Sequence, residues 1–255
     1  MRNHHLTAKA LAEAGFIAIA PLHRVDHLID TKRRPAAIKY RTNELAQALE
    51  SVLQIDGFRR IIDLSRIHAI GYSLGGITAL HAAGMGYDNT LILAHCLDNL
   101  DPEFCEESSF IERKKMQYFR DVEPPNLDSN VPERYFSIPL ITGGVAVIAP
   151  IGQGLTYTDN LFSATEVFIA GFEDDQIALP EFHTRFLLEI IPKKYIYDFE
   201  IREGNHWSFI APFSKRVTDV EFIEAAQDKD GFDRLDFQHN INSDLIEFFM
   251  AQSGR

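Results

Sequence analysis

The sequence predicts an α/β protein in which a mostly parallel central sheet is covered by helices on both faces. Two observations support this prediction. Short, nearly all-apolar stretches such as 144–149 (GVAVIA) and 167–170 (VFIA) recur along the chain, and amphipathic helical stretches separate them. An apolar run without polar alternation is typical of a strand buried on both faces, and its alternation with helices indicates a parallel sheet.

Local signals place each element along the chain. Gly15 is a stop signal after the first helical stretch, and Pro21 ends the apolar run that follows. Pro35 occupies the first position of the second helix, where its missing N–H costs nothing. In chain order we expect a helix over 5–14, a strand over 16–20, a helix over 35–54, a strand over 67–70, a helix over 73–83, strands over 144–149 and 167–170, a helix over 181–191, a strand over 195–201 and a helix over 242–252.

The composition is that of a single globular domain spanning residues 1–255. Hydrophobic residues make up 45% of the 255 residues and charged residues 24%, which is enough apolar material for one large core. Between residues 97 and 141 the strand and helix rhythm breaks into proline-rich, acidic and mixed segments. We expect this stretch to be an irregular excursion over the carboxyl edge of the sheet, where such segments shape substrate pockets.

Charge and hydropathy exclude several classes of partner. The formal net charge of -12 argues against a nucleic-acid surface and favours neutral or cationic small molecules. No stretch approaches the roughly 18 continuous apolar residues of a membrane span, and no signal-peptide apolar region follows Met1. The chain as written is therefore expected to be cytoplasmic. The two cysteines, Cys96 and Cys105, form no CxxC or zinc-type spacing, so a bridge and two reduced thiols both remain open, and no metal is predicted.

The stretch 71–76 (GYSLGG) has the form of a nucleophile elbow. In that motif a strand ends at the first glycine and a helix begins after the serine, and the tight turn lifts the hydroxyl group clear of the sheet. The glycines let strand and helix approach closely. Ser73 is therefore the candidate nucleophile, and the Leu74 N–H at the start of the helix is the candidate oxyanion donor.

A serine nucleophile needs a base and an acid that orients the base, and both follow later in the chain. The predicted strand over 167–170 leads into an acidic turn, where Asp174 and Asp175 are both candidate acids. The predicted strand over 195–201 leads to His206, the candidate base. The order serine, aspartate, histidine is the one typical of α/β-hydrolases.

Four segments resemble the α/β-hydrolase superfamily, and within it the predicted dienelactone-hydrolase-like and platelet-activating-factor-acetylhydrolase-like esterases of bacteria. They are LTAKALAEAGFIAIAPLH (6–23), GYSLGGITAL (71–80), GFEDDQIALP (171–180) and EGNHWSFI (203–210). The resemblance implies a serine hydrolase of carboxylic esters that needs no cofactor and acts on a small-molecule ester. It gives Ser73 the role of nucleophile, His206 that of base and Asp175 that of acid. Tyr72, His23 and Trp207 adjoin these motifs and are expected to contact the substrate.

The chain departs from that family in one respect. The helix over 5–14 resembles the one that follows the third strand in such folds, so three N-terminal strands and a second oxyanion donor are expected to be missing. We expect the natural chain to begin upstream of Met1, in which case an exported or periplasmic location and a Cys96–Cys105 bridge are favoured. Two alternatives remain, namely a catalytically silent binding protein of this fold and a serine peptidase. The acyl length of the ester and the oligomeric state are not predicted.

Overall fold

The computed structural model describes residues 2–23, 34–97, 101–107, 140–159, 162–164, 166–213 and 224–253. Its α-helices are α1 (His5–Glu13), α3 (Arg34–Leu53), α4 (Asp56–Arg59), α5 (Leu74–Ala82), α6 (Asn89–Leu97), α7 (Pro102–Glu107), α9 (Leu187–Ile190) and α11 (Arg234–Ser253). Its 3-10 helices are η1 (Arg2–His4), η3 (Lys193–Tyr195), η4 (His206–Phe209) and η5 (Glu224–Ala226). Its strands are β1 (Ala69–Tyr72), β2 (Gly86–Tyr87), β3 (Val145–Ile148), β4 (Leu155–Thr156), β5 (Val167–Phe172) and β6 (Ile196–Arg202).

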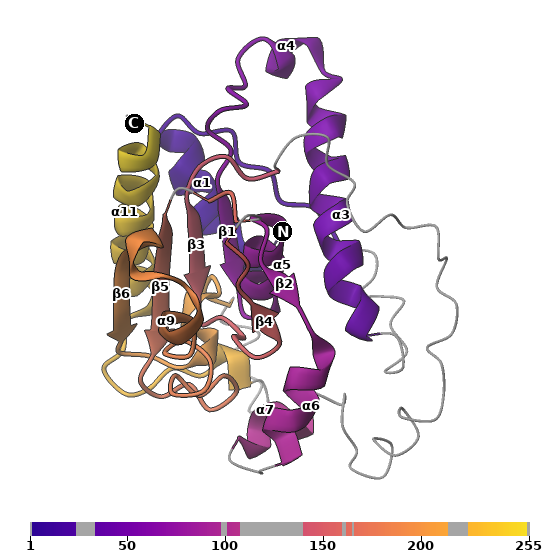
Figure 1. Cartoon of the computed structure of the whole chain (residues 1–255). Helices are drawn as coiled ribbons and strands as arrows, with labels where there is room; N and C mark the ends of the chain where they lie inside the picture. The colour runs from indigo at the N-terminus through magenta and orange to yellow at the C-terminus, as the bar shows by residue number, and fades with distance from the viewer. Residues whose placement is uncertain are drawn as a thin grey trace.

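The central sheet has four parallel strands in the order β1-β3-β5-β6 (Figure 1). The short strands β2 and β4 form a separate antiparallel pair. Strands β3 and β5 lie in the middle of the sheet, and every residue of both is buried. The sequence prediction of a parallel α/β sheet is therefore confirmed.

Alternate residues of the central strands face two separate apolar layers. On one side Val145 and Val147 of β3 belong to a core shared with α3 and α5. On the other side Ala146 and Ile148 belong to a core shared with α11. Helix α1 packs against α11 on this second side, and the two lie together in Figure 1. Because both faces of the sheet are covered at its middle, β3 and β5 are apolar throughout rather than alternating.

Two predicted elements are wrong over most of their length, and helix α11 begins at Arg234 rather than at the predicted residue 242. The stretch 16–20 was expected to be a strand, but it has no strand assignment, and Ile17 and Ile19 are 36% and 39% exposed. Strand β1 pairs with β3 and with no other strand of the described ranges, so residues 16–20 make no ladder with its other edge. The stretch 181–191 was expected to be a helix, but turns precede the single helical turn of α9.

The excursion expected over 97–141 is described only at its two ends. Residues 98–100 and 108–139 lie outside the described residues. At the N-terminal end of this stretch, α6 and α7 are joined by a disulfide between Cys96 and Cys105, whose Cα atoms are 5.6 Å apart. Both cysteines pack with Ile92 and Phe104 in a small apolar cluster. The open question of whether these cysteines pair is therefore answered by a bridge. No described helix combines the length and apolarity that crossing a membrane requires.

Candidate active site

Ser73 occupies the turn between β1 and α5 in a backbone conformation that few non-glycine residues adopt. Its φ is 53° and its ψ is -123°. Such a conformation costs on the order of 1–3 kcal/mol, so the surroundings must impose it. The Ser73 N–H donates to the carbonyl of Ile148, and the Ser73 carbonyl accepts from the N–H groups of Gly76 and Ile151. These three backbone hydrogen bonds fix the turn from both β3 and α5.

Two glycines of the motif are required by close packing. A Cβ atom at Gly71 would lie 2.2 Å from the carbonyl oxygen of Gly75, and one at Gly76 would lie 2.8 Å from the Cβ of Pro150. Neither φ angle is positive, so the requirement is space rather than backbone conformation. The glycines therefore let α5 begin directly against the ends of β1 and β3, which raises Ser73 above the sheet edge.

The structure brings the three predicted residues into one hydrogen-bonded chain. The Ser73 Oγ atom lies 2.9 Å from Nε2 of His206, and Nδ1 of His206 lies 2.8 Å from Oδ2 of Asp175. Because an ionised carboxylate only accepts, Nδ1 carries the proton and Nε2 is free to accept the serine hydroxyl proton. His206 is 3% exposed and Asp175 is 1% exposed, so water competes little for either hydrogen bond.

The acidic turn after β5 separates its two aspartates into different roles. Asp175 Oδ1 accepts from the backbone N–H groups of Ile177 and Ala178, which leaves Oδ2 for His206. The Asp174 side chain instead forms an exposed ion pair with Lys229. The structure therefore joins Asp175, and not the alternative Asp174, to His206.

The histidine loop after β6 is held by local and tertiary hydrogen bonds. Gly204 has a φ of +132°, a region that favours glycine, and its carbonyl accepts from the Asp174 N–H. Asn205 caps η4: its side chain accepts from the Trp207 N–H, and its own N–H donates to Ser208 Oγ. Residue His206 is thus the first residue of a capped turn docked on the acidic turn.

Three other predicted site residues, Leu74, Trp207 and Tyr72, each make a different kind of contact. The Leu74 N–H opens α5, where a helix leaves its first N–H groups without intrahelical acceptors. The Trp207 ring meets the His206 ring edge to face, with centroids 5.2 Å apart, and its Nε1 is buried with no hydrogen-bond partner among the described residues. The Tyr72 hydroxyl, expected to meet the substrate, donates to the backbone carbonyl of His206.

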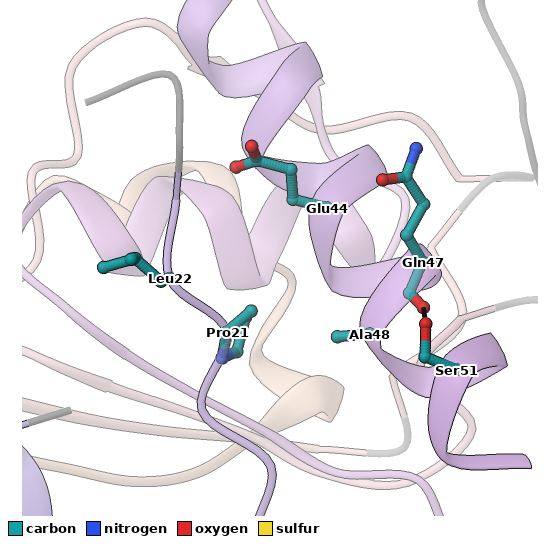
Figure 2. A pocket seen from close by; sticks show the side chains of 6 residues that line it. All are labelled: Pro21, Leu22, Glu44, Gln47, Ala48 and Ser51. Atoms are coloured by element: carbon teal, nitrogen blue, oxygen red, sulfur yellow. Dashed lines mark hydrogen bonds between the residues drawn. The ribbon is translucent and has the colours of Figure 1, made fainter. Parts of the chain in front are cut away.

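The structure pairs His23 with a residue of helix α3. Its Nδ1 lies 2.8 Å from the Glu44 carboxylate on α3. Glu44 also lines an open cavity of about 220 Å³ between α3 and the segment that precedes His23 (Figure 2). The cavity residues are Pro21, Leu22, Glu44, Gln47, Ala48 and Ser51. None of the triad residues lines this cavity, so we do not assign it to the substrate.

A second polar cluster, which the sequence did not indicate, lies beside α6 and α7. His183 is fully buried, and its Nε2 lies 2.7 Å from Oδ2 of Asp101, which is 3.1 Å from Nε2 of His95. Burial alone would raise the pKa of Asp101, but hydrogen bonds from the two histidines outweigh it and lower the pKa. Burial lowers the pKa of His183, against the effect of Asp101, which favours the neutral ring.

The proton positions in this cluster argue against a metal site. The three residues offer ligand atoms within 4.8 Å of one another. However, the Gly152 N–H donates to Nδ1 of His183, so the proton of the neutral ring is on Nε2. A histidine that binds a metal through Nε2 normally donates from Nδ1 instead. The cluster therefore connects the disulfide-linked helices to residues 152 and 183 by hydrogen bonds. His183 is 82 positions from Asp101 in sequence, and no motif signals the cluster.

The comparisons with known proteins add no relative. No protein-family model, curated protein or solved structure matches the chain. The assignment of the candidate active site therefore rests on its geometry alone.

Proposed function

We propose that the chain is a serine hydrolase of the α/β-hydrolase fold that cleaves carboxylic esters of small molecules. One observation carries the proposal: a serine in a left-handed turn donates to a buried histidine, which in turn donates to a buried aspartate. Serine alone is a weak nucleophile, and this arrangement supplies both the base and the group that orients the base. The sequence order of Ser73, Asp175 and His206 also matches that fold.

The proposed reaction proceeds through an acyl-enzyme. His206 Nε2 accepts the Ser73 proton as Oγ attacks the ester carbonyl, and the Leu74 N–H donates to the resulting oxyanion. His206 then protonates the leaving alcohol as the carbon–oxygen bond breaks. Water, deprotonated by the same Nε2, then attacks the acyl carbon; the bond from that carbon to Ser73 Oγ breaks, Nε2 returns its proton to Oγ, and the acid is released. Asp175 holds the ring orientation and stabilises the imidazolium that forms twice in each cycle.

Labelling with a fluorophosphonate, followed by intact-mass measurement, tests the proposal. The reagent phosphonylates activated serines, so we expect one adduct on the wild-type chain and none on Ser73→Ala. Ser163→Ala is the matched control, because that serine donates to backbone carbonyls away from the triad, and it should label like wild type. A folded wild-type protein that takes no adduct, or an adduct that persists in Ser73→Ala, would contradict the proposal. The first result would favour a catalytically silent binding protein.

A further inference from the structure

We propose that Tyr72 is a positioning residue that holds the backbone of His206 in register with Ser73. The inference rests on the proposed function, since it concerns the base of that reaction. Tyr72 is the last residue of β1 and immediately precedes the nucleophile. Its hydroxyl group donates to the carbonyl oxygen of His206 over 2.7 Å, although the two residues are 134 positions apart in sequence.

This hydrogen bond complements the others that hold the histidine loop. The bonds of Gly204 and Asn205 fix the loop internally and to the acidic turn. Gln238 of α11 donates to the carbonyl of Ser208, which fixes the end of η4. Tyr72 links the histidine loop to β1, the strand that precedes the nucleophile. The other described link between them, the hydrogen bond from Ser73 Oγ to His206 Nε2, is broken when the serine proton is transferred.

The Tyr72 side chain has little freedom to turn away. Its ring centroid lies 5.3 Å from that of His206, 5.2 Å from that of His4 and 5.9 Å from that of Phe209. Burial, together with the nearby Asp175 carboxylate, raises the pKa of the phenol. The raised pKa favours the protonated hydroxyl group, which can donate a hydrogen bond. Its proton is directed at a backbone carbonyl, so Tyr72 acts through His206 and not on the substrate.

Loss of this link should affect turnover more than substrate binding. Without the tie, the His206 backbone can shift relative to Ser73, and a displacement of about 1 Å at a catalytic group can cost on the order of 100-fold in rate. The Tyr72 hydroxyl donates to a protein carbonyl, so its removal takes away no direct contact with the ester. We therefore expect kcat to fall and KM to change little.

The test compares Tyr72→Phe with Tyr197→Phe. Both variants remove one hydroxyl group, but Tyr197 is a half-exposed residue of β6 whose ring packs on Phe248, away from the triad. Two quantities are measured for each protein: the rate constant of fluorophosphonate labelling at Ser73, and kcat and KM for p-nitrophenyl acetate. The fraction of protein that labels reports folding, whereas the rate constant reports the reactivity of the folded fraction. The low-field proton NMR signal of the His206 Nδ1–H monitors the histidine directly.

We expect the labelling rate constant and kcat of Tyr72→Phe to fall about 10-fold or more. KM and the labelled fraction should stay near wild type, and the low-field signal should shift or broaden. Tyr197→Phe should match wild type in every measurement. If wild type is labelled and the rate constants of Tyr72→Phe are unchanged, the role of Tyr72 is overturned but the proposed function is not. A Tyr72→Phe protein without a folded fraction would also overturn the positioning role by assigning a structural role, and an unlabelled wild type would overturn the proposed function.

Discussion

Ser73 combines a strained backbone with a part-buried reactive hydroxyl group at the junction of β1 and α5. Its carbonyl accepts from both α5 and the loop after β3, so the turn cannot relax without breaking backbone hydrogen bonds. A strained conformation of this kind persists only where the surroundings determine it more than once. The candidate nucleophile is therefore held in place before any substrate arrives, which is the condition for efficient attack.

The two neighbouring aspartates provide a residue-level prediction. Replacing Asp175 by asparagine keeps the shape but removes the acceptor charge that fixes the His206 tautomer, so kcat should fall by about 10³ to 10⁴-fold. Asp174→Asn is the matched control. It breaks an exposed ion pair with Lys229 and should change kcat by less than about threefold. Steady-state hydrolysis of p-nitrophenyl acetate measures both, and a larger loss in Asp174→Asn would assign the acid to the neighbouring residue.

Sequence reasoning predicted the three residues that the structure joins by hydrogen bonds, but not every contact that supports them. The motif around Ser73 and the placement of Asp175 and His206 after predicted strands were sufficient, because parallel strands end at one edge. The role of Tyr72 could not be predicted, since its partner is a backbone carbonyl 134 residues away. The cluster of His95, Asp101 and His183 was also missed, because tertiary packing brings His183 to Asp101 from 82 positions away and no motif marks the nearby His95.

At the scale of elements, the junction of β1 and α5 depends on glycines that have no room for a side chain. Gly71 lies against the carbonyl oxygen of Gly75, which is backbone and cannot turn aside. An added methyl group must therefore push α5 away from the strand. That displacement would move Ser73 relative to β3, since the Ser73 N–H binds the carbonyl of Ile148.

Gly71→Ala should therefore lower the free energy of unfolding by about 3 kcal/mol or more, at the upper end of overpacking effects. The helical Gly57 offers a matched control, because a Cβ atom there meets no atom within 4 Å. Gly57→Ala should leave stability unchanged or raise it by up to about 1 kcal/mol. Urea unfolding followed by circular dichroism measures both values. Equal stabilities for the two variants would show that α5 does not need the close approach.

Elements that the sequence predicted wrongly were overridden by their surroundings. Residues 16–20 have strand-forming side chains, but a strand also needs a hydrogen-bonded neighbour, and this segment pairs with no strand of the described residues although one edge of β1 is open. Residues 181–191 have an amphipathic pattern, but the His183 ring is hydrogen-bonded to both the Gly152 N–H and the Asp101 carboxylate. The backbone around His183 forms turns instead of a continuous helix. Helix α11 begins eight residues earlier than predicted, at Arg234 rather than at 242. Asp233 accepts from the N–H groups of Leu235 and Asp236 and so caps it there.

At the scale of the whole molecule, the layered architecture brings distant segments to one edge. The apolar cores on the two faces fix β3 and β5 in the middle, and the parallel arrangement places the turns after β1, β5 and β6 at the same end (Figure 1). Ser73 and His206 meet there although 133 residues separate them in sequence. The catalytic arrangement that we propose is thus a consequence of the sheet order rather than of any local motif alone.

Turnover of matched ester, thioester and peptide substrates by the wild type and His206→Ala tests the central claim most directly. The account predicts measurable hydrolysis of p-nitrophenyl esters, the slowest turnover for peptides, and a loss of ester turnover by about 10³-fold or more in His206→Ala with an unchanged circular dichroism spectrum. Preferred cleavage of peptides would indicate a peptidase. Ester hydrolysis that survives in folded His206→Ala, or a folded wild type that hydrolyses no ester, would contradict the account.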